Sequence, residues 1–237
     1  MVVDVLNGGQ EEVTAVLCSG GLDSVVLVAQ EATSRRVQPV YVSSGFSWES
    51  EESERLSRLL KAAVFSKRVR KIVWLECPIT DTYPQTHWAL TGKPPAYATP
   101  DSDVYLIGRN VMLLTKIGTY CVLQGISRIA VGSLVGNPFP DATPLFLKAM
   151  SKALSLGLDQ QIEIVAPFAE FAKSEVIKIG NELGVPFELT LSCMNPVRSS
   201  HCGRCSKCRE RLQAFSVAGF EDIADYDFRP SDVSTGL

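Results

Sequence analysis

Long hydrophobic runs are missing from this sequence of 237 residues. None of its apolar segments approaches the roughly 18 consecutive apolar residues that a membrane-spanning helix needs. Residues 1–4 show neither the basic stretch nor the apolar stretch of a secretory signal peptide. We therefore expect a cytoplasmic protein that has no membrane partner.

Excess basic charge is missing as well. The chain has 23 Lys and Arg against 26 Asp and Glu, which gives a formal net charge of −3. Proteins that bind nucleic acid usually carry a strongly basic surface, so we expect no direct contact with nucleic acid. One local basic run is interpreted as the solvated face of a helix; it consists of Arg204, Lys207, Arg209 and Arg211.

Internal repeats and low-complexity segments are also absent, and the chain instead alternates between two apolar patterns. Short apolar runs that are typical of buried strands are followed by segments with helical periodicity. The runs lie at residues 13–18, 37–42, 71–75, 129–131 and 162–165, and the helical segments at 22–32, 49–63, 108–125, 145–156 and 174–183. This alternation predicts an α/β fold with an open, mostly parallel, Rossmann-like sheet and helices on both faces. We expect residues 1–188 to form this domain and residues 189–237 to form a segment packed on it.

Residues 77–103 interrupt the alternation. This stretch contains five prolines and few apolar periods. Structureless segments of this length in a compact domain are usually functional or mobile, so we expect a lid over a binding pocket.

A glycine-rich turn joins the first predicted strand to the first predicted helix; its sequence is Cys18-Ser19-Gly20-Gly21-Leu22-Asp23-Ser24. Glycines allow the backbone to approach an anion closely, and the N–H groups of such a turn can bind phosphate oxygens. The hydroxyl groups of Ser19 and Ser24 add donors, whereas Asp23 is suited to hold a Mg²⁺ ion that bridges the phosphates. The pattern is neither the Walker loop nor the dinucleotide-binding fingerprint. We interpret all seven residues as a phosphate-binding loop for a nucleotide; a plain turn with a serine cap is the alternative.

Four of the seven cysteines crowd into one short stretch, at Cys193, Cys202, Cys205 and Cys208. Disulfides are rare in reducing compartments, and four thiolates can close the tetrahedral shell of a structural Zn²⁺ ion. We therefore predict that these four residues are zinc ligands, with an iron–sulfur cluster or disulfides as alternatives. His201 is then surplus, and we expect it to be solvated or to support a ligand. The remaining cysteines are expected to be small core residues.

These motifs together resemble a known family. The string S-G-G-x-D-S matches the pyrophosphate loop (PP-loop) of the N-type ATP pyrophosphatases, which use ATP to activate a carbonyl-type oxygen. Over roughly residues 13–215 the chain resembles the 7-cyano-7-deazaguanine synthase family, called QueC. The matching segments include Arg109-Asn110, Pro140-Asp141 with Pro144 and Phe146, Lys173-Ser174-Glu175-Val176-Ile177, Gly184-Val185-Pro186, Leu189-Thr190-Leu191-Ser192-Cys193, and His201-Cys202-Gly203 with Cys205, Cys208 and Arg211.

The resemblance implies an adenine nucleotide alpha hydrolase-like fold and an enzyme that uses ATP, Mg²⁺ and a structural Zn²⁺ ion. Its reaction would be that of a ligase forming carbon–nitrogen bonds: it joins ammonia to 7-carboxy-7-deazaguanine and proceeds through an amide to 7-cyano-7-deazaguanine (preQ0), a queuosine precursor. Relatives are commonly homodimers, so a homodimer is expected.

The resemblance also suggests roles for single residues. Asp23 would act in catalysis by holding Mg²⁺, and Lys173 would reach the phosphates or the leaving group. Arg109 would bind phosphate or the substrate carboxylate through its guanidinium fork. A solvent-facing lysine and a surface ion pair are the alternatives for these two basic residues. Asn110 would contact the substrate or cap its helix, and residues 40–44 would lie near the adenine.

The chain departs from the family where relatives form the substrate pocket. Met194 replaces the usual tyrosine, and residues 134–138 and 139–143 differ from the usual sequence. A QueC-like ligase acting on a different deazapurine or conjugation target is therefore the first alternative function. Another PP-loop enzyme that modifies tRNA is the second, and a non-catalytic protein that binds a partner through its zinc segment is the third.

Overall fold

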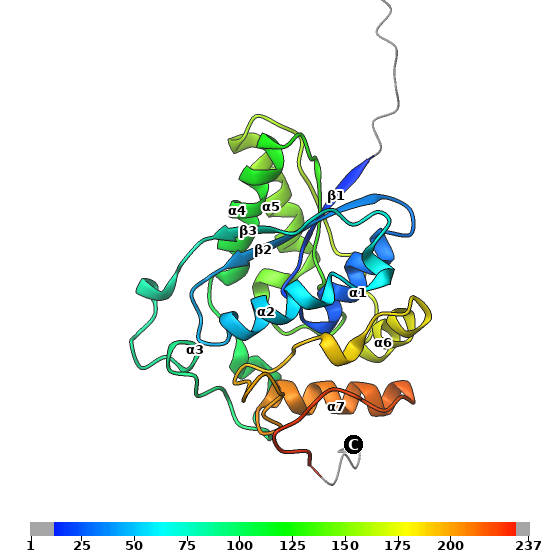
Figure 1. Ribbon diagram of the computed structural model, residues 1–237. Coiled ribbons are helices and arrows are strands. Elements are labelled where there is room, and N and C mark those ends of the chain that lie inside the picture. The colour runs from blue at the N-terminus through cyan, green and yellow to red at the C-terminus, as the bar shows by residue number, and fades with distance from the viewer. Residues whose placement is uncertain (1–11, 231–237) are drawn as a thin grey trace, which may run out of the picture.

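A single parallel sheet forms the centre of the computed structural model, which describes residues 12–230 (Figure 1). Its five strands are β1 (Val13–Leu17), β2 (Arg36–Ser43), β3 (Val73–Glu76), β4 (Arg128–Ala130) and β5 (Glu163–Val165). They lie in the order β3-β2-β1-β4-β5, and every neighbouring pair is parallel. The predicted α/β fold with a parallel sheet is confirmed. The boundary between residues 188 and 189 stays a prediction, and the ends of the two predicted units, 1–11 and 231–237, lie outside the described residues.

Helices cover both faces of the sheet, as the alternation predicts. On one face lie α1 (Leu22–Glu31), α2 (Glu49–Leu59) and α6 (Lys173–Glu182), with α7 (Ser206–Ala218) packed on the outside of α6, and on the other lie α4 (Arg109–Leu123) and α5 (Pro144–Gly157). Successive side chains of a strand point to opposite faces, so Ala15 and Val16 of the central strand enter two different apolar clusters. Both are fully buried, which explains why β1 reads as a continuous apolar run rather than as an alternating one.

The order of the strands decides where a ligand can bind. The chain leaves β1 toward β2 and β3 and later returns to the other side of β1 as β4. The connections from β1 and β4 therefore diverge at the carboxyl ends of the strands. Open parallel sheets bind their ligands in the crevice at such a switch point.

Residues 77–103 are packed rather than open. They contain the short helix α3 (Trp88–Thr91), and Ile79 and Ala89 join a separate apolar cluster with Phe46 and Trp48. Arg209 of α7 donates hydrogen bonds to the carbonyl oxygens of Tyr97 (2.5 Å) and Thr99 (2.7 Å). The stretch is therefore held against the cysteine-rich segment.

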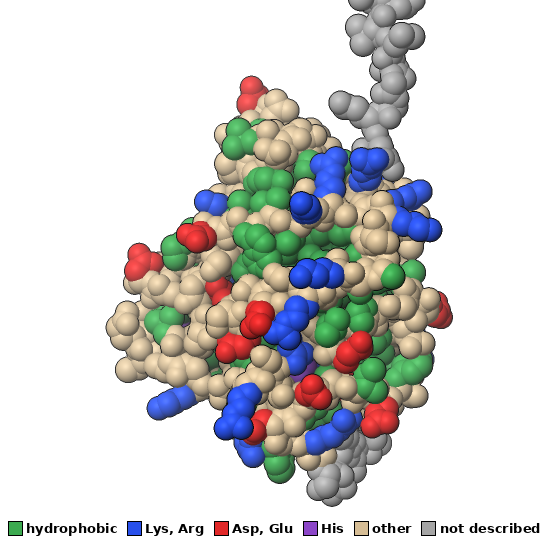
Figure 2. Space-filling model, viewed as in Figure 1, with side chains coloured by type: hydrophobic (Ala, Val, Ile, Leu, Met, Phe, Trp, Pro, Cys, Tyr) green, Lys and Arg blue, Asp and Glu red, His purple; other side chains and the backbone are tan. Residues whose placement is uncertain are grey.

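Helix α7 is absent from the elements that apolar periodicity predicts. The interpretation of the basic run as the solvated face of a helix is wrong for its three members in α7, Lys207, Arg209 and Arg211. Of the four, only Arg204 has an exposed side chain. Arg211 is buried, and it forms two hydrogen bonds with Asp222, from Nε to Oδ2 (2.7 Å) and from Nη2 to Oδ1 (3.0 Å). On the face viewed in Figure 2, basic and acidic side chains are mixed over the lower part of the molecule, and no uniformly basic surface is visible there.

The C-terminal segment should be sensitive to the loss of either partner of the buried pair Arg211–Asp222. Removing one partner leaves a buried charge without compensation, which costs about 3–5 kcal/mol. We expect Arg211→Met to lower the free energy of unfolding by this amount in a denaturant titration. The matched control is Arg204→Met, where an exposed ion pair with Asp227 is lost and about 1 kcal/mol or less is expected. Equal losses in both variants would contradict the assignment.

Acid should weaken the same pair. Burial alone would raise the pKa of Asp222, but the hydrogen bonds and charge of Arg211 outweigh it and keep the pKa below its ordinary value of 3.8. The folded chain therefore binds this proton less readily than the unfolded chain, so the stabilisation is present above about pH 4 and lost as the pH falls toward the lowered pKa. We expect the difference in free energy of unfolding between wild type and Asp222→Asn to shrink from about pH 6 to about pH 3. A difference that is independent of pH would contradict this.

Candidate active site

The glycine-rich turn lies at the switch point, between the end of β1 and the start of α1. Gly20 has φ = +81°, and a side chain at this position would place its Cβ only 3.2 Å from the Cβ of Leu56. The Ser24 hydroxyl donates to the carbonyl oxygen of Gly21 (2.9 Å) and accepts from the N–H of Ser19 (3.2 Å). It therefore stabilises the turn itself, in addition to any contact with a phosphate. The positive end of α1 begins at Leu22 and faces the same turn.

A cavity of about 250 Å³ extends from this turn along the carboxyl ends of β1, β2 and β4. Cys18 is buried at its wall, and Tyr41 and Val42 line it within the segment predicted to lie near adenine. Gly132, which follows β4, also lines it, and a Cβ there would lie 3.3 Å from the backbone of Asp23 and Ser24. The missing side chain at Gly132 is what allows β4 to pack directly against the turn.

A second cavity of about 250 Å³ begins on the other side of the turn. Apolar side chains of Trp48, Leu106 and Met194 line it, together with the ammonium groups of Lys173 and Lys207. The two cavities share a set of lining residues, namely Ser19, Gly21, Asp23, Arg109, Asn110, Phe139 and Asp141. Ligands in the two cavities would therefore meet at the phosphate-binding turn.

Lys173 reaches the turn directly, which excludes a solvent-facing position for its side chain. Its Nζ lies 3.2 Å from Oδ2 of Asp23 and forms a second ion pair with Glu210. Burial alone would lower the pKa of Lys173, but these two carboxylates outweigh it and raise the pKa above its ordinary value. The ammonium group is therefore charged at neutral pH.

Only one of the two carboxylate oxygens of Asp23 has a partner among the described residues. Its Oδ1 atom is buried and has no hydrogen-bond partner among residues 12–230. Burial raises the pKa of Asp23, and the charge of Lys173 opposes this shift. A bound cation would satisfy the free oxygen, so Asp23 fits the role of a Mg²⁺ ligand.

Arg109 and Asp141 stand where the cavities meet. The Arg109 guanidinium lies over the ring of Phe46, with 5.8 Å between Cζ and the ring centroid, and its buried Nε has no partner in the described part of the chain. Asp141 accepts hydrogen bonds from the backbone N–H (3.2 Å) and the side-chain amide (3.2 Å) of Asn110. Asp141 therefore caps the start of α4 and holds the side chain of Asn110. Arg109 keeps a free N–H donor for a ligand.

Sequence reasoning does not find Glu52, which also lines the second cavity. Its carboxylate accepts a hydrogen bond from the Tyr41 hydroxyl (2.8 Å). Burial raises the pKa of Glu52 to about 7, although the charge of Arg109 opposes this. The available signal is the position of Glu52 on the apolar face of α2, in helical spacing with Leu56 and Leu59.

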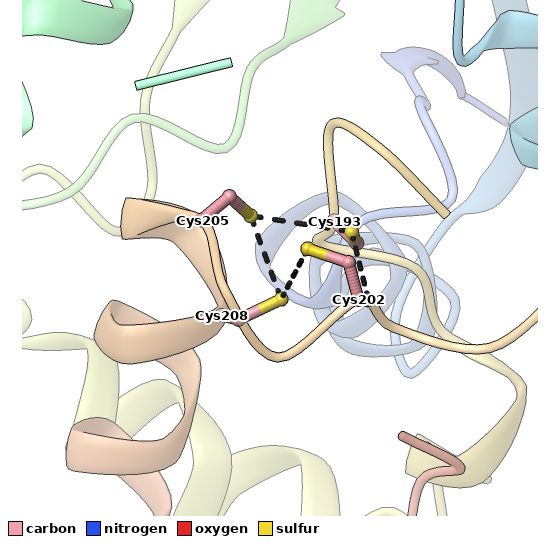
Figure 3. Close-up of side chains that lie close together, drawn as sticks. All are labelled: Cys193, Cys202, Cys205 and Cys208. Atoms are coloured by element: carbon pink, nitrogen blue, oxygen red, sulfur yellow. Dashed lines mark hydrogen bonds between the residues drawn. The ribbon is translucent and has the colours of Figure 1, made fainter. Parts of the chain in front are cut away.

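The four cysteines of the C-terminal segment converge on one point (Figure 3). All four Sγ atoms lie within 4.8 Å of one another, and three of the separations are 4.0 Å (Cys193–Cys205), 3.9 Å (Cys202–Cys208) and 3.5 Å (Cys205–Cys208). A tetrahedral Zn²⁺ ion with bonds of about 2.3 Å would separate its sulfur ligands by about 3.8 Å. The cluster therefore fits a zinc ion that is bound by four thiolates.

His201 is not solvated, contrary to one of its two interpretations. It is fully buried, its ring stacks on Tyr226 with 5.0 Å between centroids, and its Nε2 accepts a hydrogen bond from the N–H of Ser192 (3.2 Å). Ser192 directly precedes the first cysteine of the cluster. His201 therefore supports the loop that carries Cys193.

The cysteine segment is joined to the phosphate-binding turn. The N–H of Leu191 donates to the carbonyl oxygen of Gly20 (3.0 Å), two residues before Cys193. A Cβ on Gly21 would lie 3.6 Å from the carbonyl oxygen of Leu191. The turn, the second cavity and the cysteine cluster thus form one connected region.

Known proteins are similar in sequence to nearly the whole chain. A family model described as "Queuosine biosynthesis protein QueC" matches residues 13–219. The 7-cyano-7-deazaguanine synthase of Methanopyrus kandleri is 33% identical over 231 residues, which cover 90% of this chain and 98% of the relative. The 7-cyano-7-deazaguanine synthase of Methanobrevibacter smithii is 29% identical over 218 residues, with 88% and 95% covered. Among solved structures, a 4-thiouridine synthetase–RNA complex with bound ATP is 16% identical, with a TM-score of 0.45 and 88% and 51% covered. Since the family model matches most of its length, the chain belongs to the QueC family.

Proposed function

We propose that the protein converts 7-carboxy-7-deazaguanine and ammonia to 7-cyano-7-deazaguanine at the expense of ATP, as a carbon–nitrogen ligase of the cytoplasm and as a homodimer. The observation that carries this proposal is the meeting of two cavities at the phosphate-binding turn, in a chain of the QueC family. The first cavity would take the adenosine of ATP, and the second would take the acid. The carboxylate would then face the phosphates across the turn.

The chemistry requires that both carboxylate oxygens leave bound to phosphorus, as phosphate or as AMP. An oxygen of the carboxylate attacks phosphorus of ATP and expels pyrophosphate or ADP, which gives a mixed anhydride. Ammonia then attacks the carbonyl carbon and displaces AMP or phosphate, which gives the amide and a proton. A second ATP activates the amide oxygen in the same way, and loss of this group and of the two N–H protons leaves the nitrile. The protein would position the reactants and stabilise the negative charge that develops on oxygen and phosphate.

The residues of the chain divide these tasks. Backbone N–H groups of the turn would bind phosphate oxygens, and Arg109 would donate its free Nε–H to the carboxylate or phosphate. Lys173 would neutralise the leaving group. Asp23 would hold Mg²⁺, which when bound supplies positive charge to the phosphates. The zinc ion would have a structural role, because four thiolates leave no coordination position for a substrate.

A different acid is the second candidate function, and one observation favours it. Met194 and Phe139, at positions where the chain departs from the family, both line the second cavity. Met194 presents a flexible thioether without a hydroxyl donor. An acid that differs from 7-carboxy-7-deazaguanine in the groups facing these residues would be accommodated by the same mechanism.

Mass spectrometry of the reaction tests the proposal. Purified protein is incubated with ATP, Mg²⁺, ammonium and 7-carboxy-7-deazaguanine, and we expect the acid to be replaced first by the amide and then by the nitrile. Omission of ammonium should stop the reaction before the amide. If ATP binds but the acid is not consumed, the proposed substrate is wrong, and the search moves to related acids.

Asp23→Asn should abolish turnover with little effect on folding. The amide keeps the shape of the side chain but removes the charge that a Mg²⁺ ion needs, so we expect turnover to fall by about 100-fold or more. Asp159→Asn is the matched control, since Asp159 is exposed in the turn after α5 and asparagine tolerates its φ of +50°. Turnover within twofold or so of wild type in Asp23→Asn would refute the assignment of this carboxylate to Mg²⁺.

Cys205→Ser should remove the zinc ion. Three thiolates bind zinc far less tightly than four, so we expect the zinc content to fall from about one ion per chain to near zero, with a lower melting temperature. Cys121→Ala is the control, because Cys121 is buried in the core outside the cluster and its loss should destabilise the fold without loss of zinc. A full complement of zinc in Cys205→Ser would contradict the four-cysteine site.

A further inference from the structure

Four charged side chains of alternating sign connect the phosphate-binding turn to α7. Asp23 of α1 pairs with Lys173 of α6 (3.2 Å), Lys173 pairs with Oε1 of Glu210, and Oε2 of Glu210 pairs with Lys207 (2.6 Å). All four side chains are at least three-quarters buried. This series of ion pairs begins at the proposed Mg²⁺ ligand Asp23 and ends at Lys207, beside the cysteine cluster.

Without Glu210, the two cations at Asp23 would compete for one carboxylate. The Lys173 ammonium group already contacts Oδ2 of Asp23, and a Mg²⁺ ion bound there would repel it at short range. A buried ammonium group that loses its partner is destabilised unless another anion lies within reach. Glu210 lies within reach of Nζ in the present geometry, so Lys173 need not move far to exchange partners.

The position of Glu210 is well determined by its surroundings. One of its oxygens contacts each lysine, and it lies two residues after Cys208 in the helix that starts at Ser206. The carboxylate therefore lies between two ammonium groups and is held in place by α7.

We propose that Glu210 is a positioning residue. It becomes the ion-pair partner of Lys173 when Asp23 binds Mg²⁺, so that the lysine stays charged and directed at the phosphates. The proposal rests on the Mg²⁺·ATP site that is part of the proposed function. It adds a residue of the cysteine-rich segment to the machinery of the nucleotide site. It also gives Lys207, which lines the second cavity, the task of holding Glu210 from the other side.

The test measures the Mg²⁺ requirement of ATP binding, with neither acid nor ammonium present. ATP binding is followed by calorimetry at a series of Mg²⁺ concentrations. In Glu210→Gln, Lys173 has only Asp23 as an anionic partner, so Mg²⁺ must displace it; we expect the half-saturating Mg²⁺ concentration to rise about tenfold. Binding of ATP in the absence of Mg²⁺ should not weaken. Zinc content should match that of the wild type, whereas the melting temperature should fall somewhat, because Lys207 loses its carboxylate partner.

A double-mutant cycle separates this role from a general effect of charge. In a Lys173→Met background no ammonium competes for Asp23, so Glu210→Gln should leave the Mg²⁺ requirement unchanged. Glu210→Asp should recover part of the wild-type behaviour, since it restores the carboxylate. An unchanged Mg²⁺ requirement in the single variant Glu210→Gln overturns the proposal, as does an equal rise in both backgrounds.

The same measurements distinguish failure of this inference from failure of the proposed function. If the wild-type protein binds Mg²⁺·ATP but does not convert the acid, the proposed function is wrong. The double-mutant cycle then still decides the role of Glu210. ATP binding that is independent of Mg²⁺ in the wild type overturns both the Mg²⁺ assignment and the role of Glu210.

Discussion

Close packing around the turn between β1 and α1 is the constraint on which the rest of the site depends. Three segments from distant parts of the chain touch this turn: α2 at Leu56, the residue after β4 at Gly132, and Leu191 ahead of the cysteine cluster. The contacts at Leu56 and Gly132 are close because a glycine on one side lacks a side chain, whereas Leu191 is held by its hydrogen bond to Gly20. The turn is therefore rigid before any ligand arrives, and a rigid set of N–H donors is what phosphate binding needs.

Whereas α7 joins the main apolar cluster, the cysteine-rich stretch that precedes it is held largely by polar contacts. Its apolar cluster is small and consists mainly of the four cysteines with Leu191. The remaining order comes from Arg211, which is buried against Asp222, and from Arg209, which holds residues 97–101. A stretch with so little apolar surface gains its order from charge pairs, and a metal ion bound by the four cysteines would add to it.

Local patterns in the sequence were sufficient to predict the α/β fold and its parallel sheet. Continuous apolar runs identify the buried parallel strands, and the glycine-rich turn and the spacing of the cysteines identify two regions of chemistry without reference to anything far along the chain. Contacts between distant residues were not predictable in this way. Glu210 and Lys207 look like members of a solvated helix face until α6 and α1 are placed beside them. Arg211 has the same charge as the exposed Arg204, and only the position of Asp222 makes it a core residue.

The place of β1 in the sheet has a consequence for synthesis of the chain. It is the first described strand along the chain and the central strand of the sheet, so it needs a neighbour on each side. One neighbour, β2, follows soon after, but Thr14 and its partner Arg128 in β4 are separated by 114 residues. At translation rates of about 5–20 residues per second, one edge of the nascent strand waits on the order of ten seconds for its partner. During that interval the exposed edge is open to pairing with other nascent chains.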